Sequence, residues 1–130
     1  MKVAESVLRD KAKTFAKSIV LLCRQIKATH KEAVLTNQLL RSGTSIGANL
    51  HEAQYAQGTK DFISKFEIAL KECHETEYWL ELLHETGYWL TLLHKTAYMD
   101  DATYKNLSVK CASIRAMLVA SCKTAKENTK

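Results

Sequence analysis

Histidines and carboxylates gather in the second half of the chain, at spacings that raise the question of a metal site. Glu81 and His84 form a Glu-x-x-His motif, and carboxylate-bridged di-iron bundles use two such motifs with two further glutamates. The next copy has Thr91 in place of the acid before His94. His74, His84 and His94 are ten residues apart, which turns successive side chains by about 80° on a helix. We therefore expect no metal and no cofactor.

No other motif indicates catalysis. Gly43 and Gly47 belong to a helical pattern and lack the lysine of a phosphate-binding loop. The four cysteines include no CxxC pair, so the close ligand spacing of a zinc site is absent. Small buried thiols are their expected role. No spacing marks a Cys-His or Ser-His pair, and we expect a protein that is not an enzyme.

Cations recur at helical spacing in the first and last parts of the chain. In the first part no acid shares their arc, and Asp10 lies at its edge. A one-sided row of cations suits a phosphate backbone, whereas a surface that serves only solubility is typically of mixed sign. A solvated face is the alternative. The candidate nucleic-acid-binding residues are Lys2, Arg9, Lys13, Lys17, Arg24, Lys27, Lys105, Arg115, Lys123 and Lys126.

A polar row and a glycine pair share the helical stretch around residue 45. Gly43 and Gly47 flank its apolar side, where each glycine costs about 1 kcal/mol. Close approach of another helix would compensate, and the same flank could also pack between subunits. The polar row is either a structural network, with Arg41 pairing Glu72 or Glu75, or a contact surface; we favour the network. Its members are Gln38, Arg41, Ser45, Asn49 and Glu52.

Four amphipathic helices must position these residues. Apolar side chains recur every three or four positions over about residues 5–28, 30–57, 61–96 and from 101 onward. Thr29 to Glu32 has the form of a capping box, and Gly58 that of a residue that ends the second helix. Thr59 or Asp61 would cap the third helix, and Asp100 the fourth. The pattern predicts an all-α, antiparallel up-down four-helix bundle with an extended third helix, as a single domain over residues 1–130.

A ten-residue repeat explains the length of the third helix. Residues 74–83 read HETEYWLELL, and residues 84–93 follow as HETGYWLTLL. A helix ending at Gly87 would leave apolar residues in a long loop, which is rare, so we expect it to continue to about Lys95 or Thr96. The aromatic residues of the two blocks could stack on bases, although a core or subunit interface is the commoner role. They are Tyr78, Trp79, Tyr88 and Trp89.

Residues 40–49 (LRSGTSIGAN), with Glu52 and Ala53, resemble bacterial four-helix-bundle proteins encoded in intervening sequences of 23S rRNA genes. Motifs within residues 61–83 support this, and the resemblance covers roughly residues 5–125. It implies a homopentamer in the bacterial cytoplasm. Many members carry proline at the position of Gly47, which predicts a bend. More distantly, the chain resembles the accessory protein of diversity-generating retroelements, which would make a reverse transcriptase a partner.

Composition and charge limit the function classes. The 130 residues are 46% hydrophobic and 25% charged, which predicts a folded chain, and no apolar run is long enough for a bilayer. Residues 1–60 carry a net charge of +6, residues 61–101 of −6, and residues 102–130 of +5. We expect a cytoplasmic, homo-oligomeric protein that binds nucleic acid, RNA above all, through a basic face. The alternative is a protein-interaction scaffold without nucleic-acid binding.

Overall fold

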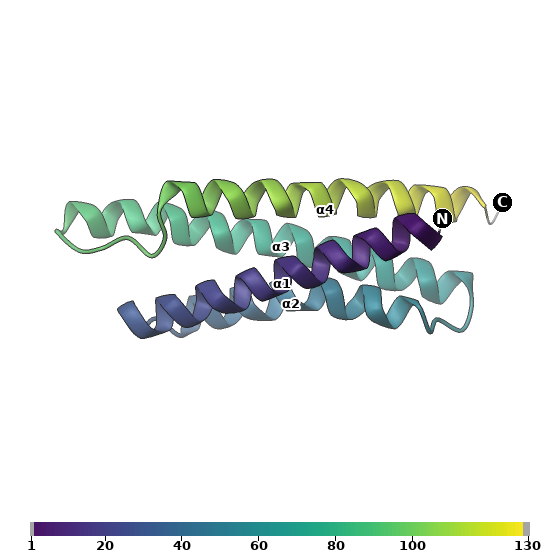
Figure 1. Ribbon diagram of the computed structural model, residues 1–130, viewed down its shortest axis with the longest axis horizontal. Coiled ribbons are helices and arrows are strands. Elements are labelled where there is room, and N and C mark those ends of the chain that lie inside the picture. Colours follow the sequence, from purple (N-terminus) through teal and green to yellow (C-terminus); the bar gives the residue numbers. More distant parts are fainter. Residues whose placement is uncertain (1, 129–130) are drawn as a thin grey trace.

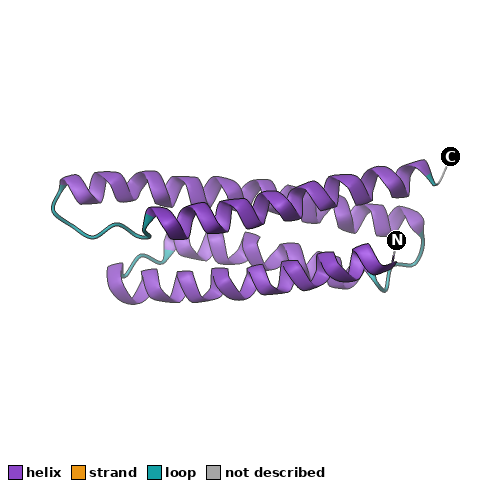
Figure 2. Cartoon of the chain, turned by 45° about the horizontal axis from the view of Figure 1, so that its top comes forward, coloured by secondary structure: helices purple, strands orange, loops and turns teal. Residues whose placement is uncertain are grey.

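The computed structural model describes residues 2–128, with Lys2 described by its backbone alone, as helices and loops without a strand (Figure 2). Successive helices are antiparallel neighbours, and α1 also packs against α4, which closes the bundle (Figure 1). The first and last helices meet most sparsely. The all-α antiparallel up-down bundle is therefore confirmed. The helices are α1 (Lys2–His30), α2 (Val34–Ala53), α3 (Thr59–Leu92) and α4 (Asp101–Glu127).

One apolar stripe from each helix fills the core. Burying each such side chain contributes about 1.5–3 kcal/mol. All four cysteines are buried and free. Burial raises the pKa of the Cys23 thiol to about 11, so this thiol stays protonated at neutral pH and is a poor nucleophile. The largest fully buried side chains include Leu8, Phe15, Ile19, Ile26, Leu39, Ile46, Leu50, Leu80, Leu83, Ile114 and Leu118.

The two glycines of α2 face α1 inside the same chain. A Cβ on Gly43 would lie 3.0 Å from Cγ2 of Ile19, and a Cβ on Gly47 would lie 3.7 Å from the backbone of Ala12. Close helix approach therefore offsets their low helix propensity, as predicted. α1 covers Gly43, which is buried, whereas Gly47 is half-buried, so packing of this flank between subunits stays a prediction at Gly47.

The turn between α1 and α2 differs from the predicted capping box. Thr29 lies within α1, and Lys31 ends that helix with a φ of 56°. The Glu32 carboxylate accepts from the backbone N–H groups of Leu35 and Thr36, at 2.8 and 3.2 Å. Glu32 thus caps α2 from in front of its first turn, and α2 begins four residues later than expected.

The start of α3 also differs from the prediction. The second helix ends at Ala53 rather than Gln57, so Gly58 does not terminate it. Gly58 is instead the residue before α3, in an extended conformation, and no side chain caps the helix. Asp61 accepts from the backbone N–H of Gln57 at 3.2 Å, so it holds the loop rather than the helix end.

The third helix continues past Gly87, as predicted, and is the longest of the four (Figure 1). It ends at Leu92, about three residues early, where His94 adopts a φ of 61°. The following loop folds back, and a Cβ on Gly87 would lie 3.1 Å from Cβ of Ala97. Nε2 of His30 donates to the carbonyl of Thr96 at 2.7 Å, which ties this loop to the end of α1.

Candidate nucleic-acid interface

Three cations on the outer surface of α1 form the clearest part of the predicted basic face. Lys13, Lys17 and Arg24 lie opposite the buried stripe that contains Phe15 and Ile19, and none of the three is buried. Within residues 2–128, no carboxylate pairs with any of them. We call these three residues the α1 cation row. Their charges are available to an external anion.

Two further candidate cations of α1 are half-buried or hydrogen-bonded within the chain. Arg9 is half-buried and lines a hollow of about 400 Å³ between α1 and α2, together with Lys13, Gly47 and Ala48. Nζ of Lys27 donates to the side-chain amide oxygen of Asn37 in α2. The side chain of Lys2 lies outside the described residues. Lys27 thus contacts α2, whereas Arg9 also lines a hollow with Ala125 of α4.

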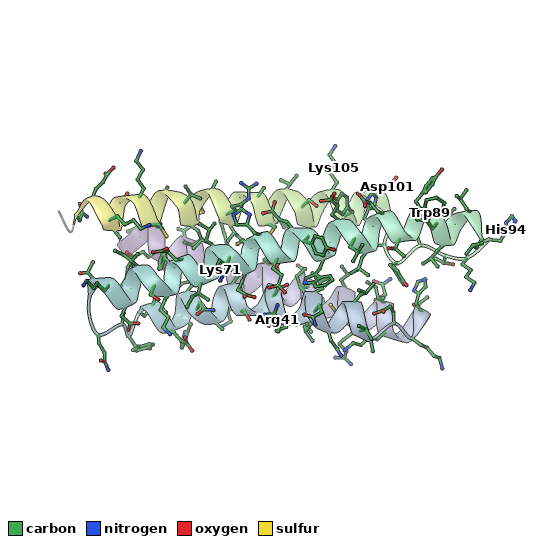
Figure 3. The ribbon with its side chains drawn as sticks, turned by 180° about the vertical axis from the view of Figure 1, so that it is seen from behind. Arg41, Lys71, Trp89, His94, Asp101 and Lys105 are labelled. Atoms are coloured by element: carbon green, nitrogen blue, oxygen red, sulfur yellow. The ribbon has the colours of Figure 1, made fainter. Side chains whose placement is uncertain are left out.

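The cations predicted on α4 divide into two kinds. Nε of Arg115 donates to Glu77 at 2.8 Å, and Nζ of Lys126 lies 3.7 Å from a carboxylate oxygen of Glu67, so both link α4 to α3. Lys105 and Lys123 are exposed, and Lys105 points away from the bundle (Figure 3). The structure does not join these residues to the α1 cation row in one continuous face, because the ion-paired members turn toward α3.

Sequence reasoning missed two lysines that face each other across the seam between α1 and α4. Lys11 and Lys110 are exposed and line a hollow of about 290 Å³ floored by Phe15 and Ile114. Each lysine precedes one of these core residues by four positions, which places it on the same helix face. That spacing is the signal that could have found them. Both lysines fall outside the outward-facing arc on which the prediction was based.

Two members of the polar row of α2 bind side chains of α3, and the predicted pairing of Arg41 with Glu72 and Glu75 is confirmed, but the row is not buried. Nη1 of Arg41 donates to Glu72 at 3.1 Å, and Nη2 donates to Glu75. Figure 3 shows Arg41 on α2. Further along the row, Glu52 pairs with Lys65 of α3 at 3.3 Å. Ser45 and Asn49 donate to backbone carbonyls one turn earlier, and Gln38 is exposed.

A buried hydroxyl pair next to this network was not anticipated. Ser42 and Thr76 are fully buried, and their hydroxyl oxygens lie 3.0 Å apart. Each hydroxyl also contacts a carbonyl of its own helix, that of Leu39 or Glu72. Polar groups in a core need such partners. Ser42 fitted the apolar stripe by position, so only its residue type hinted at a matching polar group on α3.

Comparison with known proteins identifies the family. The family model for the 23S rRNA-intervening sequence protein matches residues 5–89. The chain belongs to this family. A crystal structure of a protein of unknown function from the S23 ribosomal protein family of Bacteroides thetaiotaomicron is 42% identical, with a TM-score of 0.82. The alignment covers 92% of this chain and 98% of that chain. No curated protein matched.

In this member of the intervening-sequence family, the Glu-x-x-His motif does not assemble a metal centre. Nε2 of His84 lies 2.8 Å from a carboxylate oxygen of Asp101, and its ring stacks on Tyr104 with centroids 4.0 Å apart. Across residues 2–128, no group of three histidine, cysteine or acidic side chains could hold a metal ion. None of the described helices is long and apolar enough to cross a bilayer.

The repeated aromatic residues of this family member divide between packing and exposure. Trp79 packs against the core, and its Nε1 donates to Glu75 at 3.1 Å. Tyr78 is 57% exposed, and Tyr88 and Trp89 are each 64% exposed. The core role thus holds for Trp79 alone among the four.

Proposed function

We propose that the protein is a non-enzymatic accessory protein that binds RNA through the α1 cation row as a homo-oligomer. The observation that carries this is the contrast between two kinds of cation. Arg41 and Arg115 are neutralised by carboxylates of α3, whereas Lys13, Lys17 and Arg24 have no such partner in the described chain. Exposed, uncompensated cations at helical spacing suit a phosphate backbone.

The homo-oligomer is part of the proposal because one row is short. Each phosphate contact contributes modestly, and repeating the row in every subunit would raise the effective concentration of sites. The family resemblance implies a pentamer. Large exposed apolar side chains along α1 and α4 offer surface for assembly, for example Leu21 at 67% and Val109 at 62% exposure. A cytoplasmic location and RNA as the nucleic acid agree with the family's name.

The test is salt-dependent binding of a labelled single-stranded RNA by two matched triple variants. Changing Lys13, Lys17 and Arg24 to glutamate should abolish binding while the fold remains, because all three side chains point away from the core. The control changes Lys60, Lys71 and Lys95 to glutamate, which alters the net charge equally but lies on α3 and its loop. The parent and the control variant should share one log–log salt slope, with a magnitude of about 0.7–0.9 for each phosphate that the protein neutralises.

Comparing the two variants distinguishes binding at the α1 cation row from a general effect of net charge. Equal weakening in both would mean that only net charge matters. Unchanged binding by the α1 variant at equal salt would refute the proposal.

A protein-interaction scaffold is the second candidate function, favoured by a different observation. The distal end of α3 exposes Tyr88, Trp89, Leu92 and Leu93, and tryptophan and tyrosine are enriched among the residues that dominate protein interfaces. A reverse transcriptase, suggested by the resemblance to retroelement accessory proteins, is one such partner. Absence of RNA binding together with capture of a protein through this end would favour the scaffold.

A further inference from the structure

The distal end of α3 carries an open hollow with an aromatic and acidic lining. It has a volume of about 510 Å³, and its lining includes Glu85, Tyr88, Trp89 and Asp101. The two aromatic rings meet edge to face with centroids 5.8 Å apart. Figure 3 shows Trp89 and Asp101 near the end of the bundle. No arginine or lysine lines the hollow.

The first block of the repeat has a glutamate and a tryptophan at the same spacing, and there the glutamate binds an arginine. There the Glu75 carboxylate accepts from the indole Nε1 of Trp79, four residues later, at 3.1 Å. The same carboxylate accepts from the guanidinium of Arg41, which reaches across from α2. Glu72 accepts from the same guanidinium at 3.1 Å. Two carboxylates of α3 thus hold an arginine within the molecule, and one of the two also binds the indole of Trp79.

The second block repeats the two residue types, but within residues 2–128 neither an arginine nor the Trp89 indole binds Glu85. Glu85 and Trp89 repeat Glu75 and Trp79 ten residues later, rotated by about 80° around the helix. The rotation turns Glu85 away from α2 and leaves it exposed. Within residues 2–128, no side chain pairs with the Glu85 carboxylate. The hollow therefore presents the acceptor and the aromatic surface to an external cation.

We propose that this hollow binds an arginine side chain of a partner protein. The planar guanidinium can lie flat on an aromatic ring and donate two parallel hydrogen bonds to one carboxylate, and the ammonium of lysine lacks this bidentate geometry. Asp101 adds a second acid at the rim, and its side chain is 97% exposed. One of its carboxylate oxygens lies 2.8 Å from Nε2 of His84, which also lines the hollow, so Glu85 is the acid without a partner. The acidic lining repels phosphate, so nucleic acid does not fit here.

A second copy of this chain is a poorer occupant. Arg41 and Arg115 are held in ion pairs, and Arg9 is half-buried. Only Arg24 among the arginines is both exposed and unpaired within the described chain. Docking Arg24 in the hollow of another copy would remove this residue from the α1 cation row. The structure therefore favours a different protein with an accessible arginine.

The probe is a blocked Gly-Arg-Gly tripeptide, with its citrulline counterpart as the neutral isostere. The readout is the indole N–H resonance of Trp89 in a ¹⁵N-labelled protein, assigned by comparison with Trp89→Phe. The arginine peptide should shift this resonance in a saturable way and leave that of Trp79 unmoved. The citrulline peptide should bind at least about tenfold more weakly, because it lacks the charge-assisted hydrogen bonds.

Two matched variants locate the site. Glu85→Gln should weaken binding of the arginine peptide about tenfold, through loss of a charged acceptor. Glu81→Gln, an exposed acid one turn earlier that does not line the hollow, should bind as the parent does. Equal affinity of the Glu85→Gln variant and the parent, or no shift of Trp89 with the arginine peptide, would overturn the proposal.

A further control addresses self-association. If the Trp89 resonance moves with protein concentration alone, and Arg24→Glu removes that dependence, a second copy occupies the hollow. That outcome would overturn the assignment to a different protein.

Discussion

Side chains along α2 differ in how substitution or a change of pH affects them, because each contacts different neighbours. Arg41 and Glu75 stabilise each other's charged forms: hydrogen bonding to Glu75 raises the pKa of Arg41, and hydrogen bonding to Arg41 lowers the pKa of Glu75. A lowered carboxyl pKa contributes stability above its ordinary value, and that contribution is lost as the pH falls through the folded-state value. The α2–α3 link should therefore weaken only in acid.

The glycine pair of α2 gives a sharper residue-scale prediction. Replacing either glycine by alanine gains about 1 kcal/mol of helix propensity. At Gly47 the added methyl has room, so Gly47→Ala should stabilise the protein by up to about 1 kcal/mol. At Gly43 it would press on Ile19, which is fully buried, and such overpacking costs about 1–3 kcal/mol.

Denaturant unfolding of the two glycine variants measures the difference. Gly43→Ala should be the less stable by about 1–3 kcal/mol. Equal stabilisation by both substitutions would show that α1 can move away, contrary to the packing described.

At the scale of the elements, the sequence predicted the helices well and the turns poorly. The apolar stripes could be predicted because the buried residues recur at helical spacing, as Leu8, Phe15 and Ile19 show. The turns depend on single backbone conformations, such as the positive φ of Lys31 and His94, which residue type alone does not predict because non-glycine residues adopt them rarely. Likewise, the predicted basic face divided because Arg115 and Lys126 found acids on α3, a pairing that requires the three-dimensional arrangement.

The repeat in α3 allows a matched pair of deletions. Of residues 84–93 only Gly87 is buried, whereas residues 74–83 bury Thr76, Leu80 and Leu83. After either deletion the remaining block can occupy the same place, and the two products differ only where Glu77 and Glu81 correspond to Gly87 and Thr91. Deleting residues 84–93 should therefore leave a folded bundle.

Deleting residues 74–83 should give the less stable product. It places Gly87 where Glu77 stood, at about 1 kcal/mol in helix propensity, and removes the acid that binds Arg115, a partly exposed pair worth up to about 1 kcal/mol. The expected difference is about 1–2 kcal/mol, measured by thermal and denaturant unfolding. A less stable product from the deletion of residues 84–93 would contradict this account.

The whole molecule separates its charges and leaves apolar surface uncovered. α1 and α4 are mainly basic, and α3 is mainly acidic. The exposed apolar residues include Val3, Leu21, Val109 and Val119 on α1 and α4, and Trp89, Leu92 and Leu93 at the end of α3. Of these, Trp89, Leu92 and Leu93 lie close together in sequence at one end of α3, and an exposed apolar cluster is typical of a contact with another chain. The proposed assembly would use the apolar surface, and the proposed RNA binding would use the separate α1 cation row.

Sedimentation should show that the protein is not a monomer. A single chain has a mass of 14.7 kDa, and we expect a species near five times that mass at micromolar concentration. The mass should not change between low and high salt, because apolar burial is not screened by ions, whereas RNA binding by the α1 cation row should weaken steeply over the same range. The triple substitution of that row should leave the mass unchanged, which separates assembly from RNA binding. A mass of a single chain at every salt concentration would contradict the oligomer, and dissociation in high salt would mean that ion pairs between the basic and acidic helices hold the subunits together.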